Sequence, residues 1–363
     1  MKNILNSLII ILMTAYLISC TSYSRSDLKG ISSDQSDIYK ILYYASLAGS
    51  SHNSQPWKAE VYSEDSILIF ADKSKQLRVV DPSSRELYMS VGAFIENFNL
   101  AAQCFGYESD IKINDLSGDS CSHVATIILI RSKPEKVIAS LKDIELRTTL
   151  RIPFDTTEIN KDDWRKLVSN DTVNIHYLPS NSEKGRYLKQ KELEAYTEQA
   201  KRENAQDELA TWIRFSNKDV RQKNDGLTTA GMGINGIGGF VVRNFFKPTD
   251  SKKESFVTQG IDKTRIQADN CGGWIVITQP AENIENWINT GRLYQRMNIQ
   301  CRNLKIGFHP MNQIIEENNY ELSAGKFLGF DGKLEFIARI GYVNNYPAPV
   351  SVRRPVESFT TFR

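Results

Sequence analysis

Two long amphipathic segments, far apart in the chain, constrain the fold most. Ser90 to Tyr107 and Gly291 to Phe308 align without gaps, so that Asn97 falls on Asn298, Gly106 on Gly307 and Tyr107 on Phe308. Both segments have the apolar spacing of a helix and end in a glycine followed by an aromatic residue. A chance match between two long helices is the alternative. Because the chain has 363 residues, enough for about two domains of ordinary size, the repeat suggests two related halves.

Shorter patterns surround these two helices. In the first half we expect a helix over Asp37 to Ala48, strands over Lys58 to Tyr62 and Ser66 to Phe70, a helix over Arg85 to Phe105, and a strand over Thr126 to Ile130. In the second half we expect helices over Pro134 to Leu146 and Ile284 to Leu304, and strands over Val173 to Tyr177, Gly273 to Thr278 and Leu334 to Tyr342. The charged stretch Glu183 to Phe215 is interpreted as a solvated helical arm, and the glycine-rich stretch Gly226 to Gly239 as a mobile flap.

The first nineteen residues resemble an export signal rather than part of the fold. Lys2 is followed by an apolar run that closes with Leu17-Ile18-Ser19-Cys20, which resembles a bacterial lipobox. We therefore predict a signal peptide over 1–19, lipidation of Cys20, and a polar tether over 20–35. A cleaved signal with an incidental cysteine, or a single membrane anchor, is the alternative. Because Thr21 rather than Asp follows Cys20, the expected place is the cell envelope, anchored in the outer membrane and facing the periplasm.

Charge and metal-ligand patterns exclude other classes. Lys plus Arg number 45 and Asp plus Glu 43, so the near-zero net charge gives no basic field for nucleic acid. The four histidines form no HExxH or Cys/His cluster, so no metal site is expected. Cys104, Cys121, Cys271 and Cys301 have no CxxC spacing, which favours free thiols over a disulfide scaffold.

One motif matches a dinucleotide fingerprint only in its letters. Gly231-Met-Gly233-Ile-Asn-Gly236 reads GxGxxG, but the polar stretch Arg221 to Asp225 precedes it where a buried strand is required. We interpret it as part of the flap. The chain also has no GxSxG motif, and no histidine stands in a pattern that would activate a nucleophile.

Two polar segments suggest a binding site. Ser50 to Trp57 concentrates hydroxyl, imidazole and amide groups in a loop, which suits the edge of a flat heterocycle. Arg147, Thr149 and Arg151 place two guanidinium groups around a hydroxyl, which suits a phosphate. Loop capping and surface arginines are the alternative for both segments.

These residues resemble a known family. Ser50-Ser51-His52-Asn53-Ser54-Gln55-Pro56-Trp57 resembles the PSSxNxQPW loop of nitroreductase-like flavoproteins, with Gly49 where the family has proline. Arg147-x-Thr149-x-Arg151 resembles their RxSxR motif, with threonine for serine. Further segments resemble the tandem, Acg-type branch: Asp81-Pro82-x-x-Arg85-Glu86 with Gly92 and Asn97, Arg339-x-Gly341-Tyr342, and Arg353-Arg354-Pro355.

The resemblance implies an α+β fold that is normally an intertwined homodimer with FMN at the interface. Here it implies a pseudo-dimer within one chain, with halves over 36–133 and 134–363 and a flap insertion over about 183–260, able to act as a monomer. Because each motif occurs in only one half, one complete FMN site is expected.

The resemblance also implies roles for individual residues. The phosphate and the pyrimidine edge of FMN are expected at Arg147, Thr149 and Arg151, with a further clamp from Arg353 or Arg354. The isoalloxazine is expected beside Ser50, Ser51 and Asn53, with the backbone of Pro310, Met311 and Asn312 facing flavin N5. No catalytic side chain is assigned, because flavin N5 carries the hydride.

Two functions follow from the resemblance. The first is an FMN-dependent oxidoreductase that reduces nitro or quinone-like small-molecule acceptors with an unidentified electron donor. The alternative is an FMN-binding lipoprotein that sequesters flavin with little turnover, and a pseudoenzyme without flavin is a third reading. The flap and the charged arm, which could cover the site, favour sequestration.

Overall fold

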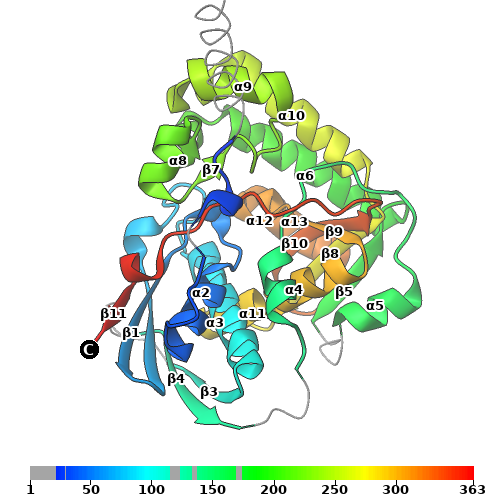
Figure 1. The fold of residues 1–363 in the computed structure, drawn as a ribbon. Coiled ribbons are helices and arrows are strands. Elements are labelled where there is room, and N and C mark those ends of the chain that lie inside the picture. Colours follow the sequence, from blue (N-terminus) through cyan, green and yellow to red (C-terminus); the bar gives the residue numbers. More distant parts are fainter. Residues whose placement is uncertain (1–21, 29, 115–122, 133–136, 169–173) are drawn as a thin grey trace, which may run out of the picture.

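The computed structural model describes residues 22–28, 30–114, 123–132, 137–168 and 174–363. Two β-sheets stand side by side, and a group of helices extends beyond them at one end of the molecule (Figure 1). The predicted signal peptide and Cys20 lie outside the described residues, as does Cys121.

The first half is an antiparallel sheet with one long helix. Its strands follow the order β1-β2-β4-β3, and α3 joins β2 to β3. The bounds are α2 (Asp37–Ser46), β1 (Trp57–Ser63), β2 (Ser66–Ala71), α3 (Arg85–Cys104), β3 (Tyr107–Ile113) and β4 (Ala125–Arg131), with short 3₁₀ turns η2 (Ser51–Asn53) and η3 (Lys73–Lys75).

The second half repeats this arrangement. Its strands follow the order β5-β8-β10-β9, again antiparallel, and α11 joins β8 to β9 as α3 joins β2 to β3. The bounds are α4 (Leu141–Leu146), α5 (Lys161–Val168), β5 (Ile175–Pro179), β8 (Gly273–Gln279), α11 (Ile284–Asn303), β9 (Ile306–Pro310), α12 (Gln313–Glu316), α13 (Asn318–Leu328) and β10 (Lys333–Tyr342). The predicted α+β class and its duplication in one chain are therefore confirmed.

The two long helices pack on each other through a pair of glycines. A Cβ atom at Gly92 would clash with the backbone carbonyl of Ile288, and one at Gly291 would clash with that of Met89. This reciprocal contact makes Gly92 and Gly291 equivalent positions in the two halves. The ends of α3 and α11 agree with this, because Cys104 is then equivalent to Asn303.

The alignment of the two long helices that we expected from the sequence is therefore displaced by two residues. The left-handed position after each helix is Gly106 (φ 82°) in the first half and Lys305 (φ 54°) in the second. Gly307 lies inside β9 instead. The glycine–aromatic match misled because Lys305 adopts a conformation that usually marks a glycine.

A helical insertion separates β5 from β8. It contains α6 (Glu183–Lys201), α7 (Glu203–Trp212), β6 (Ile213–Arg214), α8 (Asn217–Lys223), β7 (Leu227–Thr228), α9 (Gly236–Phe245), η4 (Pro248–Lys252) and α10 (Glu254–Asp269). The solvated arm expected over 183–215 is wrong for α6, because Leu188, Glu192 and Ala195 are buried against the second sheet and its helices. The charged residues of α6 misled because most of them lie on its outer side, although Glu192 is buried.

Both ends of the described chain return to the first half and the insertion. After β10 the chain crosses the molecule (red in Figure 1) to η5 (Val356–Ser358) and β11 (Thr360–Phe362), which pairs in parallel with β1. Near the N-terminus, η1 (Arg25–Asp27) packs beside the crossing segment through Arg25 N–H, which donates to the carbonyl of Val350 at 3.3 Å. This part of the chain thus differs from the free tether expected over 20–35.

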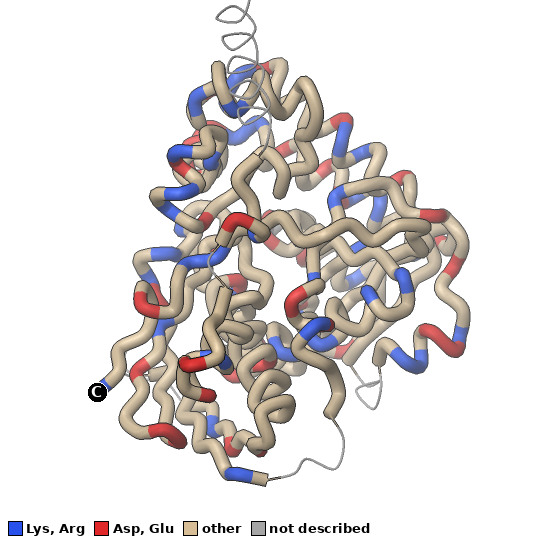
Figure 2. Tube along the Cα trace, in the orientation of Figure 1, with Lys and Arg blue, Asp and Glu red and all other residues tan. Residues whose placement is uncertain are grey.

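Charged side chains of both signs are spread along the described chain. Lys and Arg alternate with Asp and Glu over most of the trace in Figure 2. Within the described residues, no helix is both long enough and apolar enough to cross a bilayer.

Candidate functional site

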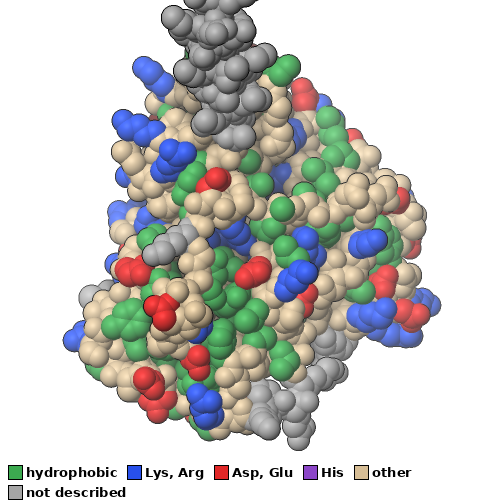
Figure 3. Space-filling view, viewed as in Figure 1, with side chains coloured by type: hydrophobic (Ala, Val, Ile, Leu, Met, Phe, Trp, Pro, Cys, Tyr) green, Lys and Arg blue, Asp and Glu red, His purple; other side chains and the backbone are tan. Residues whose placement is uncertain are grey.

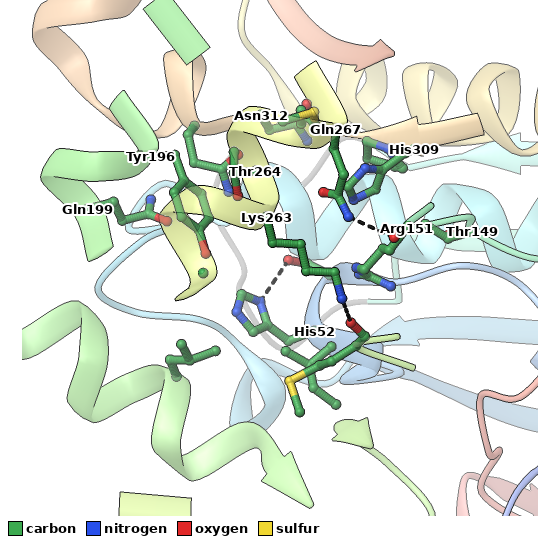
Figure 4. Close-up of a pocket in the computed structure, with 18 of the residues that line it drawn as sticks. His52, Thr149, Arg151, Tyr196, Gln199, Lys263, Thr264, Gln267, His309 and Asn312 are labelled. Carbon is green, nitrogen blue, oxygen red and sulfur yellow. Dashed lines mark hydrogen bonds between the residues drawn. The ribbon is translucent and has the colours of Figure 1, made fainter. Parts of the chain in front are cut away.

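A cavity of about 660 Å³ lies where the two halves and the insertion meet (Figure 4). The first half contributes α3 and the loop before β1, the second half contributes the segments after α4 and after β9, and the insertion contributes α6, α7 and α10. Seven residues predicted from the sequence line this cavity: Ser50, Ser51, Thr149, Arg151, Pro310, Met311 and Asn312.

The loop before β1 is held in an unusual backbone conformation. His52, Asn53 and Gln55 all have positive φ, at 48°, 53° and 55°. Ser50 Oγ accepts a hydrogen bond from Gln55 N–H at 3.0 Å, and Ser90 Oγ accepts one from Ser51 N–H at 3.2 Å. Left-handed residues other than glycine are costly, and they concentrate at functional sites.

The Arg147 to Arg151 segment runs extended past β9. Leu150 N–H donates to the carbonyl of Phe308 at 3.1 Å. Arg339 of β10 is fully buried beneath it and donates to the carbonyl of Ile152 at 2.8 Å, which fixes the segment on the sheet. Arg151 therefore enters the cavity, where its Nη1 donates to the carbonyl of Gly231 at 3.0 Å.

Three arginines gather just behind the cavity wall. Burial lowers the pKa of Arg25, Arg147 and Arg353, and repulsion from Arg147 lowers the pKa of the other two further. Among the described ion pairs none joins these guanidinium groups to a carboxylate. Each also keeps a buried nitrogen without a partner: Nη2 of Arg25 and Nε of Arg147 and Arg353.

The cluster adjoins the cavity at Gly49. A Cβ atom there would meet Tyr294 Oη and would stand 3.2 Å from Arg147 Nη1. The glycine thus allows Tyr294 Oη and Arg147 to pack closely against the backbone of this cavity-lining loop.

Asn53 and Arg354 do not line the cavity. Asn53 Oδ1 accepts a hydrogen bond from Arg353 Nη1 at 2.9 Å, and Asn53 Nδ2 donates to the carbonyls of Gly226 and Val352. Arg354 donates to the carbonyls of Gln55 and Trp57, at 2.6 and 3.0 Å. Both residues hold the loop before β1 in place.

The backbone of 310–312 offers few free donors. Pro310 has no N–H, and Met311 N–H donates to the carbonyl of Ile337 at 2.9 Å. The side chain of Asn312 is fixed as well, because its Nδ2 donates to Glu86 Oε1 at 3.0 Å and its Oδ1 accepts from Ile337 N–H. Within 310–312, the N–H of Asn312 is therefore the backbone donor that could face the expected flavin ring.

The sequence did not reveal several residues that lie in the cavity or just behind its wall. Lys263 of α10 donates to the carbonyl of Met232, and burial lowers its pKa. His309 lies in β9 as an acceptor from Arg339 Nε at 3.0 Å, and burial holds its pKa well below the ordinary value. Arg25 was assigned to the tether. None of the three stands in a recognisable local motif, so only the fold brings them to the site.

Buried carboxyl groups form the wall opposite the arginines. Glu86 accepts from Ser51 Oγ, and Glu316 is hydrogen-bonded to Glu86 and accepts from Gln199 Nε2 at 2.6 Å. Burial and the charge of Glu86 raise the pKa of Glu316 well above its usual range. The raised pKa and the hydrogen bond to Glu86 both favour the protonated form of the Glu316 carboxyl group.

No metal centre is present in the described part of the chain. No group of three or more His, Cys, Asp or Glu side chains converges there. Cys104, Cys271 and Cys301 are free thiols.

Fold and site together define an α+β protein with two repeated halves, a cavity where the halves and the insertion meet, and a cationic cluster behind the cavity wall. No family model matches the chain. Over 94 residues it is 33% identical to two curated proteins of Mycobacterium tuberculosis, from strains CDC 1551 / Oshkosh and ATCC 25618 / H37Rv, each named "Putative NAD(P)H nitroreductase". The match covers 26% of this chain and 27% of each relative, so the chain matches about a quarter of their length.

Two solved structures are similar over longer stretches but less closely. A nitroreductase-like family protein from Bacillus cereus is 12% identical, with a TM-score of 0.30 over 60% of this chain and 91% of that chain. A structure from Anabaena variabilis titled "putative nitroreductase" is 11% identical, with a TM-score of 0.40 over 76% of this chain and 69% of that chain. At these TM-scores neither assigns the fold. The 94-residue match therefore supports a nitroreductase-like relationship over part of the chain.

Proposed function

We propose that the protein is an FMN-dependent oxidoreductase of nitroreductase type, which reduces nitro or quinone-like small molecules. The observation that carries the proposal is the cluster of Arg25, Arg147 and Arg353, which lies behind the cavity wall and adjoins the cavity at Gly49. These groups donate to carbonyl and amide oxygens, but no described ion pair with a carboxylate balances their charge. Burying cations without a counter-charge is strongly unfavourable, so such a cluster favours an anionic ligand. A phosphate ester provides two negative charges and the acceptors that three guanidinium groups require.

The residues present fit FMN at both ends. Arg147, Arg353 and Arg25 would hold the phosphate through nitrogens that now lack partners. Thr149 and Arg151 would face the pyrimidine edge of the ring, and Ser50 and Ser51 would lie against it from the other half. When bound, the flavin supplies hydride transfer. The protein's own contribution is to bind and orient the flavin and the acceptor, to exclude water, and to place the Glu316 carboxyl group, whose pKa burial raises, in the cavity wall.

Two hydrogen bonds to the glycine-rich stretch support flavin sequestration as a second candidate function. The donors of Arg151 and Lys263 are occupied by the carbonyls of Gly231 and Met232, which lie in the glycine-rich stretch expected to be a flap. A segment held in this way closes the cavity and would restrict a bulky electron donor. If the segment is a lid, dithionite should reduce the bound flavin faster than NAD(P)H does. Equal rates with ordinary turnover of a nitroaromatic would exclude sequestration.

For the location we propose a lipid on Cys20 that anchors the protein in the outer membrane, facing the periplasm. The support is the sequence Leu17-Ile18-Ser19-Cys20. The wild-type chain should fractionate with membranes and the Cys20→Ser chain should be released. A soluble wild type would contradict the proposal.

Flavin titration of the purified protein tests the function. We expect one FMN per chain, and Arg147→Ala should weaken FMN binding roughly ten- to hundredfold, because a charged hydrogen-bond partner contributes about 1.5–3 kcal/mol. Riboflavin, which lacks the phosphate, should lose much less. Arg165→Ala is the control, because Arg165 is exposed and pairs only with Asp162. Two equivalent flavins per chain, or equal losses for both ligands, would refute the proposal.

A further inference from the structure

Helix α9 carries its apolar side chains outward. Ile237 is 85% exposed and Phe245 73%, and Val241 and Phe246 are also exposed. Ile237, Val241 and Phe245 recur at intervals of four residues, so they form one stripe along the helix. Such stripes normally face a protein core.

The one charged residue of the same helix is buried, whereas Phe240 and Val242 are half-buried and Asn244 is exposed. Arg243 is only 8% exposed, and Gly239 is buried beside it. A surface helix in water has the opposite arrangement, with charged residues outward. The inverted arrangement suits surroundings that are themselves apolar, and exposed apolar surface of this kind marks interaction sites.

Basic residues border the stripe. Lys218, Arg221 and Lys223 of α8 and Lys247 after α9 are all exposed. Lys and Arg side chains gather at this end of the molecule in the view of Figure 3, where α8 lies in Figure 1. An apolar stripe with a basic margin matches helices that lie in the interface of an anionic bilayer.

The chain's N-terminal segment is attached to this same end. Tyr23 N–H donates to Asn217 Oδ1 at 2.9 Å, and the guanidinium of Arg221 lies 5.0 Å from the centre of the Tyr23 ring. Cys20 is three residues before Tyr23. A fully extended chain spans at most about 3.6 Å per residue, so a lipid on Cys20 would be attached within roughly 11 Å of the Tyr23 backbone.

We propose that α9, with the basic margin of α8, is a membrane-docking surface that lies in the interface of an anionic phospholipid bilayer. The lipid on Cys20 would hold the protein near the membrane, and α9 would set its orientation. The docking surface is continuous with the cavity wall, because Met232, Gly233, Ile234 and Asn235 line the cavity and α9 begins at Gly236. If the proposed function holds, a docked α9 would open the site toward lipid-soluble acceptors such as long-chain quinones.

Vesicle binding by the chain without its lipid tests the surface directly. The mature Cys20→Ser protein should co-sediment with phosphatidylglycerol/phosphatidylethanolamine vesicles more than with pure phosphatidylcholine vesicles, and salt should weaken this binding. The double variant Ile237→Ser/Phe245→Ser should have an affinity for these vesicles that is lower by roughly tenfold or more, because two apolar side chains no longer enter the interface. Leu322→Ser is the matched control, because Leu322 of α13 is also 73% exposed but lies outside the surface.

The outcomes separate this proposal from its rivals. Absence of vesicle binding by the Cys20→Ser protein, or equal binding by the double variant, would overturn it. A concentration-dependent dimer that the double variant abolishes, without vesicle binding, would show that a second copy covers α9 and would also overturn it. Circular dichroism verifies that the variants fold. If the protein binds vesicles but does not bind flavin, the proposed function is wrong and the docking surface is still supported.

Discussion

The two sheets of this protein have the same strand order but different surroundings. In the first sheet β2 alternates between buried and less buried residues, as a sheet with one covered face does. In the second, β8 is buried at every position from Gly273 to Gln279. The long helices α3 and α11 cover one face of each sheet, and the insertion together with α12 and α13 covers the other face of the second.

The connections between strands cause the difference: α12 and α13 lie between β9 and β10, and the insertion is the longest connection. In the first half a tight turn joins β1 to β2, whereas in the second half the whole insertion stands between β5 and β8. The insertion forms one wall of the cavity and adds Lys263 to it, and the loop before β1 forms another. The crossing C-terminal segment does not line the cavity, but its Arg353 holds that loop through Asn53. The insertion occurs in only one half of the duplicated fold, so the cavity described above has no symmetric surroundings. Four predictions test this comparison of the halves.

The largest effect is expected where the halves are most alike. Gly92→Ala and Gly291→Ala should each lower the free energy of unfolding by about 3 kcal/mol or more, because each Cβ would clash with a backbone carbonyl of the opposite helix. Urea denaturation of the two variants measures this. Similar losses would support the equivalence of the two positions, and a mild effect at either would break it.

The next effect concerns a carboxyl group that only the insertion supplies. Burial raises the pKa of Glu192 to about 7, from an ordinary value of 4.5. Between these values the folded state holds a proton that the unfolded state has lost, so stability falls as pH rises through this window. Glu192→Gln should therefore be more stable than wild type by about 2–3 kcal/mol at pH 8 and nearly equal to it at pH 4.5. A difference that does not change with pH would contradict the assignment.

A smaller effect is expected for the arginine that comes from the N-terminal segment. Arg25→Ala should weaken FMN binding roughly tenfold and riboflavin binding much less, because Arg25 is the outermost of the three guanidinium groups and a charged hydrogen bond is lost. The exposed Arg78→Ala serves as control. If Arg147→Ala weakens FMN binding and Arg25→Ala does not, the segment before α2 has no part in the site.

The smallest effect tests the register of the two helices. Lys305→Gly should raise the free energy of unfolding by about 0.5–1 kcal/mol, because glycine adopts a positive φ without steric cost. Gly106→Ala should lower it by a similar amount. Gly307→Ala should be more harmful than either, since its Cβ would strike the Phe154 ring. Stabilisation by Lys305→Gly would confirm that Lys305, not Gly307, is the counterpart of Gly106.

Local pattern was sufficient to locate most helices and strands. The predicted helix over Arg85 to Phe105 is α3, that over Ile284 to Leu304 is α11, and the strand over Leu334 to Tyr342 lies within β10, with ends displaced by one residue. In these segments the apolar spacing directly reflects the packed face. The charged stretch 183–215 failed because charge on one side of a helix hides burial on the other.

The sequence by itself determined the two long helices, the central strands of both sheets, the duplication and the segments 50–57 and 147–151, because these depend on residues near one another in the chain. Only the tertiary structure decided which residues meet around the cavity. Arg25, Arg147 and Arg353 come from three distant segments, and Arg354 turns away to Gln55 although it is the neighbour of Arg353. Such encounters depend on how β11, the crossing segment and the insertion pack on the two halves, and no local pattern of residues specifies that packing.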